Sequence, residues 1–312
     1  MAIANGASET IRRARAGTYS IVARDAASGE LGVAVQSHWF SVGPIVPWAV
    51  PGVGAVATQA NVDVSYGPRA LALLAEGRDA SEALAQLLAE DPGAAGRQVA
   101  VVDAAGGVAA HTGSSCMPAA GHATGDGVSC QANIMASDAV WGAMLAAFNQ
   151  HEGRLRDRLL AALDAAEAAG GDIRGRQSAA ILVVPAAGQP WESVVSLRVE
   201  DHPEPLEELR RLCTLHDAYV LAGDADALVN EGRHDEAAAL YRRAAAAAPG
   251  NHELLFWAGL GAAQLGDVNA GVAQVREAIA AQPGWGELIG QLPDDVMPSL
   301  ATVRAQLGEL DA

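Results

Sequence analysis

The sequence of 312 residues has few cysteines, few aromatic residues and few basic residues. Its three cysteines are odd in number and sparse, which argues against a disulfide scaffold and fits a reducing cytoplasm. Aromatic residues make up 4% of the chain, yet half of it is apolar, so we expect a substantial core in which alanine-rich helices pack through small residues. The formal net charge is −17, which argues against a general binder of nucleic acid or anionic membranes, because phosphate binding needs a basic face.

Long apolar runs are also missing. No stretch of 18 or more apolar residues occurs, so the sequence predicts no transmembrane helix and no membrane partner. The basic segment "TIRRARAG", residues 10–17, is not followed by the apolar region of a secretion signal. We therefore expect a cytoplasmic protein.

Strands and helices are predicted in blocks rather than in single alternation. Three strands (18–25, 31–37 and 52–60) precede two helices, the second with a capping box of Asp79 and Glu82. Three further strands, two helices and two strands follow, at 98–103, 107–113, 127–136, 137–149 (capped by Ser137), 154–169, 178–184 and 194–201. This order favours an α+β fold of two antiparallel sheets packed face to face, with a helix pair covering each outer face.

An internal repeat follows a predicted connecting helix at residues 203–216. Residues 230–251 align with 264–285, which places Gly232 and Gly266 34 residues apart. That spacing is the tetratricopeptide period, so residues 217–312 are predicted to form a small all-α domain of such repeats, with a last helix near 296–308. Two repeats are fewer than the roughly three that such arrays need, so we expect them to dock on the first domain or to form a homodimer. A generic alanine-rich helical hairpin is the alternative.

Several strings of residues in the first two thirds of the chain are specific. They include "TYSIVARD", "GELGVAVQSHWFSVG", "AHTGSSC" and "GGDIRGRQSAAILVV". Together they resemble the bacterial and archaeal family DUF1028 over about residues 18–216. The resemblance implies an Ntn-hydrolase-like fold for residues 18–202, a four-layer α-β-β-α sandwich, which is the layering that the block order also predicts.

The resemblance also implies a nucleophile. In Ntn hydrolases the first residue of the mature chain attacks an amide carbonyl, and its own α-amine acts as the base. Thr18 matches that position, and a free α-amine, with a pKa of about 7.7–8, suits the role. Relatives commonly begin at this Thr after the initiator Met, whereas residues 1–17 precede it here. We expect this leader to be disordered, removed by cleavage after Gly17, or never translated; otherwise Thr18 is an ordinary strand start.

Other polar residues stand at the ends of the predicted strands. Gln36, Ser37 and His38 end the second strand, where His38 is predicted to tune the amine or orient the substrate. Substrate-binding roles are expected for Gln36, Ser37, Thr58, Gln59, Asp63 and Arg176, the last by binding a carboxylate. Asn133 is expected to donate to an oxyanion. The alternative is that these are ordinary polar residues at the protein surface or residues that form turns.

The function predicted is an amide hydrolase acting on a small or peptide-like amide, with no cofactor. His111, Cys116 and His122 do not have the spacing of a zinc site, so no metal is expected, and a metal-dependent hydrolase built on the two histidines is the weakest alternative. The main alternative is a catalytically silent binding module whose helical repeats recruit a partner protein.

Overall fold

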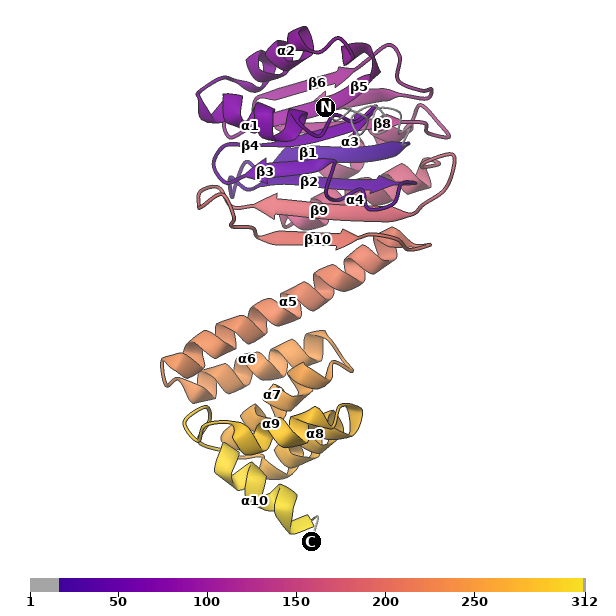
Figure 1. The fold of residues 1–312 in the computed structure, drawn as a ribbon. Coiled ribbons are helices and arrows are strands. Elements are labelled where there is room, and N and C mark those ends of the chain that lie inside the picture. The colour runs from indigo at the N-terminus through magenta and orange to yellow at the C-terminus, as the bar shows by residue number, and fades with distance from the viewer. Residues whose placement is uncertain (1–16, 311–312) are drawn as a thin grey trace, which may run out of the picture. The chain divides into compact units, whose positions relative to one another are not determined.

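The computed structural model of the chain describes residues 17–310 and contains two antiparallel sheets there (Figure 1). The larger sheet has six strands in the order β10 (Val195–Val199), β9 (Ser178–Val184), β2 (Leu31–Ser37), β1 (Thr18–Arg24), β8 (Val128–Asn133) and β7 (Gly121–Gly125). The smaller sheet has four strands in the order β3 (Pro47–Val50), β4 (Gly54–Ala60), β5 (Arg97–Asp103) and β6 (Val108–Thr112).

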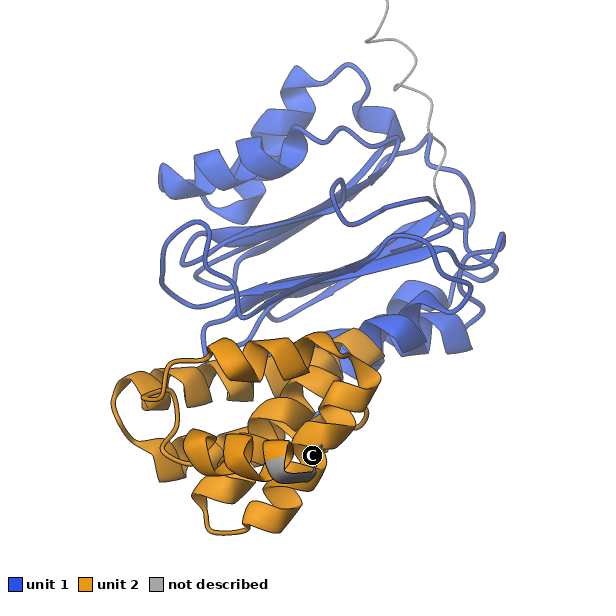
Figure 2. Cartoon of the chain, turned by 60° about the horizontal axis from the view of Figure 1, so that its bottom comes forward, with its two compact units in different colours: residues 1–210 blue, residues 211–312 orange. Residues whose placement is uncertain are grey.

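Two pairs of helices cover the outer faces of these sheets. Helices α1 (Tyr66–Ala75) and α2 (Ala80–Glu90) pack on the smaller sheet, and α3 (Val140–Gln150) and α4 (Leu155–Ala168) pack on the larger. Figure 2 shows the two sheets face to face between helices in the unit coloured blue. The predicted capping box of α2 is confirmed, because the Asp79 side chain accepts from the backbone N–H of Glu82 and the Glu82 side chain accepts in return.

The space between the sheets is apolar over most of its length and polar at one end. Alternate residues of each strand point inward, and Val22, Val35, Ala57 and Ala100 form part of the buried inner layer. Toward the polar end, the inward-pointing positions of the same strands carry hydroxyl and amide side chains instead. This change of side-chain chemistry along one layer positions the site described below.

Two strands of the structure are absent from the sequence prediction. They are β3 and β7, and each is an edge strand of its sheet. Strand β3 has only four residues and begins with a proline, while β7 reads "GHATG" and is only partly buried. Edge strands are often short, and neither of these two shows the alternation of large apolar and polar residues from which strands are predicted.

Two predicted helix boundaries are wrong. Helix α3 begins at Val140 with Ala139 as its N-cap residue, and the predicted cap Ser137 instead accepts from the backbone N–H of Ala139. Helix α5 (Pro205–Asn230) runs past the expected end of the connecting helix at residue 216. No proline interrupts it, so the connecting segment and the next predicted helix form one continuous element.

The second compact unit comprises residues 211–312 and is helical where it is described. It contains the end of α5, then α6 (His234–Ala247), α7 (His252–Gln264), α8 (Val268–Ala281), α9 (Gly284–Gln291) and α10 (Leu300–Leu310). Helices α7 and α8 approach closely, because a Cβ on Gly271 would lie 2.5 Å from the carbonyl oxygen of Gly259. None of the helices in residues 17–310 has the length and hydropathy needed to cross a bilayer.

Candidate active site

The polar end of the inner layer is organised by strand register. Thr18 begins β1 and lies directly opposite Ser37 on β2 and Asn133 on β8. Directly opposite residues of an antiparallel pair share a face of the sheet, so these three side chains lie together on the inner face. All three are at most 1% exposed.

Ser37 connects Thr18 to the residue before it. The Ser37 hydroxyl donates to the carbonyl oxygen of Gly17 at 2.5 Å and lies 2.9 Å from the Oγ1 atom of Thr18. A serine hydroxyl has one proton, and a carbonyl oxygen only accepts. The proton of the Ser37–Thr18 hydrogen bond therefore belongs to Thr18, whose hydroxyl is held beside the Gly17–Thr18 peptide bond.

An ion pair between the exposed residue Arg174 and the buried Asp172 holds the other side of the same carbonyl group. The Nη2 atom of Arg174 donates to the Gly17 oxygen at 3.0 Å and to Asp172 at 2.7 Å, and the Asp172 side chain is fully buried. A Cβ on Gly17 would lie 2.5 Å from an oxygen of Asp172 and 2.6 Å from Arg174. Only glycine fits at this position without moving the ion pair.

Gln98 on β5 of the opposite sheet fixes the direction of the surrounding amide groups. Its side-chain nitrogen donates to the carbonyl oxygens of Ala132, at 2.8 Å, and Gly121, at 3.1 Å. Because those oxygens only accept, the side-chain oxygen of Gln98 must face the other way. There it accepts from the amide nitrogens of Gln59, at 2.8 Å, and Asn133, at 2.9 Å.

The same two amide nitrogens face the backbone of Thr18. The Thr18 carbonyl oxygen lies 3.3 Å from the Nε2 atom of Gln59 and 3.5 Å from the Nδ2 atom of Asn133. Gln59 then accepts from the hydroxyl of Ser20 at 2.6 Å, and Ser20 accepts from Gln131 at 2.7 Å. The start of β1 is therefore held by a directional chain of buried hydrogen bonds, in which reversing one amide would leave its neighbours without partners.

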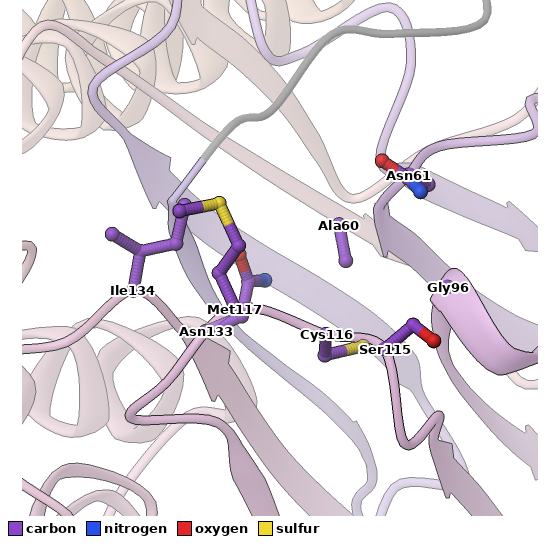
Figure 3. Close-up of a pocket in the computed structure, with 8 residues that line it drawn as sticks. All are labelled: Ala60, Asn61, Gly96, Ser115, Cys116, Met117, Asn133 and Ile134. Atoms are coloured by element: carbon purple, nitrogen blue, oxygen red, sulfur yellow. The ribbon is translucent and has the colours of Figure 1, made fainter.

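A pocket of about 240 Å³ opens beside this network, where β4 and β8 end. Ala60, Gly96, Asn133 and Ile134 form its buried part, and Asn61 and residues 115–117 complete it. Figure 3 shows Asn61 on one side and Asn133 with Ile134 on the other, with Ser115 and Cys116 between them. Burial raises the pKa of the Cys116 thiol, so this side chain is uncharged at neutral pH.

Four predicted site residues come together, and the rest do not. Thr18, Ser37, Gln59 and Asn133 form the cluster described above. Gln36 lies on the opposite face of β2, beside Tyr19, and its buried amide has no hydrogen-bond partner among the described residues. The backbone N–H of His38 is 3.4 Å from Asp172, which places His38 beside the ion pair rather than against the Thr18 hydroxyl.

The remaining predicted residues have partners within the fold. The Thr58 hydroxyl donates to the backbone oxygen of Asp63 at 3.2 Å, and the Asp63 side chain accepts from the backbone N–H of Ser65. Arg176 pairs with Glu167 at 2.6 Å and with Glu204. The guanidinium that contacts the residues around Thr18 is therefore that of Arg174.

Sequence reasoning gave no role to Gln98 and did not foresee that Asp172 and Arg174 hold the Gly17 carbonyl. A glutamine inside the apolar run "QVAVVD" was the available signal for Gln98, because an amide at an inward position of a buried strand needs partners. The string "GGDIRGRQ" contains Asp172 and Arg174, but only the fold brings that loop against Gly17.

The two histidines considered as metal ligands have other neighbours. The His111 ring is 2.9 Å from the backbone oxygen of Ala94, and the His122 ring is 2.8 Å from the hydroxyl of Thr112. Burial, and to a smaller extent His111, lower the pKa of His122. Within residues 17–310, no group of three or more His, Cys, Asp or Glu side chains is placed to hold a metal ion.

Comparison with known proteins supports the family resemblance seen in the sequence. The sequence model of a family of unknown function, DUF1028, matches residues 18–209. The chain belongs to this family. A solved DUF1028 structure, protein SPO2555 from Silicibacter pomeroyi, is 34% identical and superposes with a TM-score of 0.58 over 63% of this chain and 87% of that one. No curated protein matches the sequence. The family match begins at Thr18, the first residue of β1.

Proposed function

We propose that this DUF1028 protein is an amide hydrolase of the N-terminal-nucleophile type, and that Thr18 becomes its nucleophile when the bond after Gly17 is cleaved. One observation carries the proposal. The Gly17 carbonyl oxygen accepts from Ser37 and Arg174 while the hydroxyl of Thr18 lies against Ser37. Donors held on a carbonyl oxygen stabilise the negative charge that develops there when a nucleophile attacks the carbon.

The cleavage step uses atoms that are already adjacent. The Thr18 oxygen adds to the Gly17 carbonyl carbon, and the carbonyl oxygen takes negative charge that Ser37 and Arg174 stabilise. The C–N bond then breaks, the Thr18 nitrogen leaves as an amine carrying the proton from the hydroxyl, and an ester remains on the Thr18 oxygen. Water hydrolyses this ester, which yields a Gly17 carboxylate and a Thr18 residue with a free amine and hydroxyl.

The resulting Thr18 would act on substrates in the same way. Its free α-amine has a pKa near 7.7–8, so much of it is unprotonated near neutral pH and can take the hydroxyl proton. A substrate carbonyl that replaces Gly17 meets the donors of Ser37 and Arg174. One N–H of the Asn133 amide stays hydrogen-bonded to Gln98. The contact of Asn133 with the Thr18 oxygen is weak at 3.5 Å, so its other N–H is available to donate to an oxyanion.

The architecture supports this reading of the first unit. Two face-to-face antiparallel sheets, each with helices on its outer face, have the layer order of an Ntn-hydrolase sandwich. The position of Thr18 at the start of a central strand also suits that fold. Because one fold hosts many activities, the proposal depends on the groups around Gly17 rather than on the fold.

We also propose that residues 217–312 form tetratricopeptide-like repeats that recruit a partner protein or a second copy of the chain. The support is the period of 34 residues together with the burial of Ala237, Ala244 and Ala278 at matched positions. These small residues let neighbouring helices approach closely. Size-exclusion chromatography with light scattering tests self-association, since a monomer at all concentrations would leave only a different protein as partner.

The test of the hydrolase proposal is the mass of the purified full-length chain over time. Wild type should lose residues 1–17, Thr18→Ser should do so too, and Thr18→Ala should keep them. Processed wild type should then hydrolyse members of a panel of small amides that Thr18→Ala leaves intact. Activity in a chain that retains Gly17, or equal activity in Thr18→Ala, would reject the proposal and favour the silent binding module.

A further inference from the structure

The pocket beside Asn133 has a lining without formal charge. Its side chains are carboxamides, a hydroxyl, a thiol, a thioether and small aliphatic groups. The one ionisable group is the thiol of Cys116, and burial keeps it protonated at neutral pH. Asn133 lines the pocket and also faces the backbone of Thr18, so the pocket begins one strand away from the proposed nucleophile.

The guanidinium of Arg97, which contacts the lining residue Asn61, already has partners. Arg97 donates to Asp91 at 2.7 Å and to the backbone oxygen of Asn61 at 2.5 Å, and Asp63 lies 3.8 Å away. Arg97 is therefore already neutralised by Asp91 and would not pair with a ligand carboxylate in the pocket. For the same reason, Asp91 would not pair with a ligand ammonium group. Burying an unpaired charge is costly, whereas a neutral polar group needs only hydrogen bonds.

The backbone of the pocket is preformed. Ala60 and Ile134 have φ angles of 67° and 60°, a left-handed conformation that side-chain-bearing residues adopt only when their surroundings impose it. The N–H of Ile134 donates to the backbone oxygen of Met117, and the N–H of Asn61 donates to that of Gly96. These bonds hold both strand ends in the shape that leaves the pocket open.

We infer that this pocket receives the acyl part of the substrate, and that the acyl group is short and uncharged and ends in a carboxamide or similar group. The inference rests on the proposed function, in which the acyl group stays on Thr18 as an ester while the amine departs. The volume corresponds to roughly eight water-sized groups at about 30 Å³ each. Asn61, Ser115 and Asn133 supply both donors and acceptors around that space.

The first experiment measures binding without catalysis. Thr18→Ala protein is titrated with three probes of similar length, succinamide, succinamate and 4-aminobutanamide, and occupancy is followed by ligand-observed NMR. Succinamide should bind at least about tenfold more tightly than either charged probe, because only it avoids an unpaired buried charge. Equal or tighter binding of a charged probe, or no binding of succinamide, would overturn the inference.

A pair of neighbouring variants locates the binding. Ser115 lines the pocket and Ser114 does not, and both side chains are exposed, so neither substitution should disturb folding. In the Thr18→Ala background, Ser115→Asp should weaken succinamide and strengthen 4-aminobutanamide severalfold, while Ser114→Asp should change neither. Identical behaviour of the two variants would place the bound probe elsewhere and reject the inference.

The second experiment separates this inference from the proposed function. Processed wild type is given two anilides, one with a succinamoyl and one with a succinyl acyl group, and aniline release is measured. At least about tenfold faster release from the succinamoyl anilide supports the inference. Faster release from the succinyl anilide rejects the inference and leaves the hydrolase proposal standing. Succinamide binding with no processing and no hydrolysis rejects the hydrolase proposal and the acyl assignment, while the neutral-ligand preference of the pocket stands.

Discussion

The hydroxyl of Ser37 lies 2.5 Å from the carbonyl oxygen of Gly17, and the two residues come from segments separated by a strand hairpin. Antiparallel pairing of β1 with β2 creates this contact, because it brings the end of β2 beside the start of β1. A hydrogen bond to the carbonyl group that precedes Thr18 has no role in a finished N-terminal threonine. Under the proposed function, this hydrogen bond would assist cleavage of the Gly17–Thr18 bond.

Replacing Ser37 by alanine should slow that cleavage. The variant removes one donor from the Gly17 oxygen and the acceptor that orients the Thr18 hydroxyl, so we expect a loss of about 100-fold in rate. The rate is obtained from intact mass against time after purification. Ser114→Ala, an exposed serine outside the site, should process like wild type. Unchanged processing in a folded Ser37→Ala protein would show that this hydroxyl does not assist cleavage.

A methyl group on Gly17 should block processing. Its Cβ would lie 2.5 Å from Asp172 and 2.6 Å from Arg174, so the ion pair must move and the carbonyl loses its Arg174 donor. Gly142→Ala is the control, because a Cβ there has open space, and it should process normally. Alanine replaces glycine within a helix in that variant, which should stabilise the protein by about 0.5–1 kcal/mol. Normal cleavage of Gly17→Ala would contradict a snug fit at this residue.

The elements that carry strong apolar periodicity could be predicted from the sequence, and so could part of the site. Thr18, Ser37, Gln59 and Asn133 stand at the ends of such strands, and polar groups there are visible in the sequence. The contact of Arg174 with Gly17 was not visible. It joins residues 157 positions apart, and local patterns contain no information about which loop closes over which strand.

Gln98 illustrates the same limit within a strand. Its place inside a buried strand implies that its amide needs partners, but the sequence does not say which. They are Gln59 on the neighbouring strand and, on the other sheet, Asn133 and two backbone carbonyl groups. Such pairing depends on how one sheet is stacked on the other. Arg176 shows the reverse case, because its charge invited a substrate role while the fold supplies it with two carboxylates.

Changing Gln98 to glutamate tests the direction of the amide network. A carboxylate cannot donate to the oxygens of Ala132 and Gly121, so buried acceptors are left facing each other, and we expect a loss of about 2–3 kcal/mol in the free energy of unfolding. Processing should slow as well, since Gln59 and Asn133 lose their fixed orientation. Gln150→Glu, at an exposed position, should change stability by no more than about 0.5 kcal/mol. Urea denaturation measures both variants, and equal stability would refute the network.

Acid should selectively remove the contribution of Asp91 to stability. The hydrogen bond from Arg97 is the largest influence on this carboxyl, and the pKa of Asp91 is lowered in the folded protein. A lowered pKa stabilises the fold above the unfolded value of about 3.9, and this stabilisation disappears as the pH falls through the folded pKa. Asp91→Asn should therefore cost about 2 kcal/mol at pH 7 and progressively less below pH 4.

The measurement is urea denaturation of wild type and Asp91→Asn between pH 3 and pH 7. Asp126→Asn serves as the matched control, because Asp126 is exposed in the turn between β7 and β8, and it should follow wild type at every pH. Because Arg97 also holds the backbone oxygen of Asn61, Asp91→Asn should loosen the pocket rim and weaken succinamide binding at pH 7 in the Thr18→Ala protein. A stability difference between wild type and Asp91→Asn that stays constant across this pH range would show that the Asp91 charge contributes nothing to the fold.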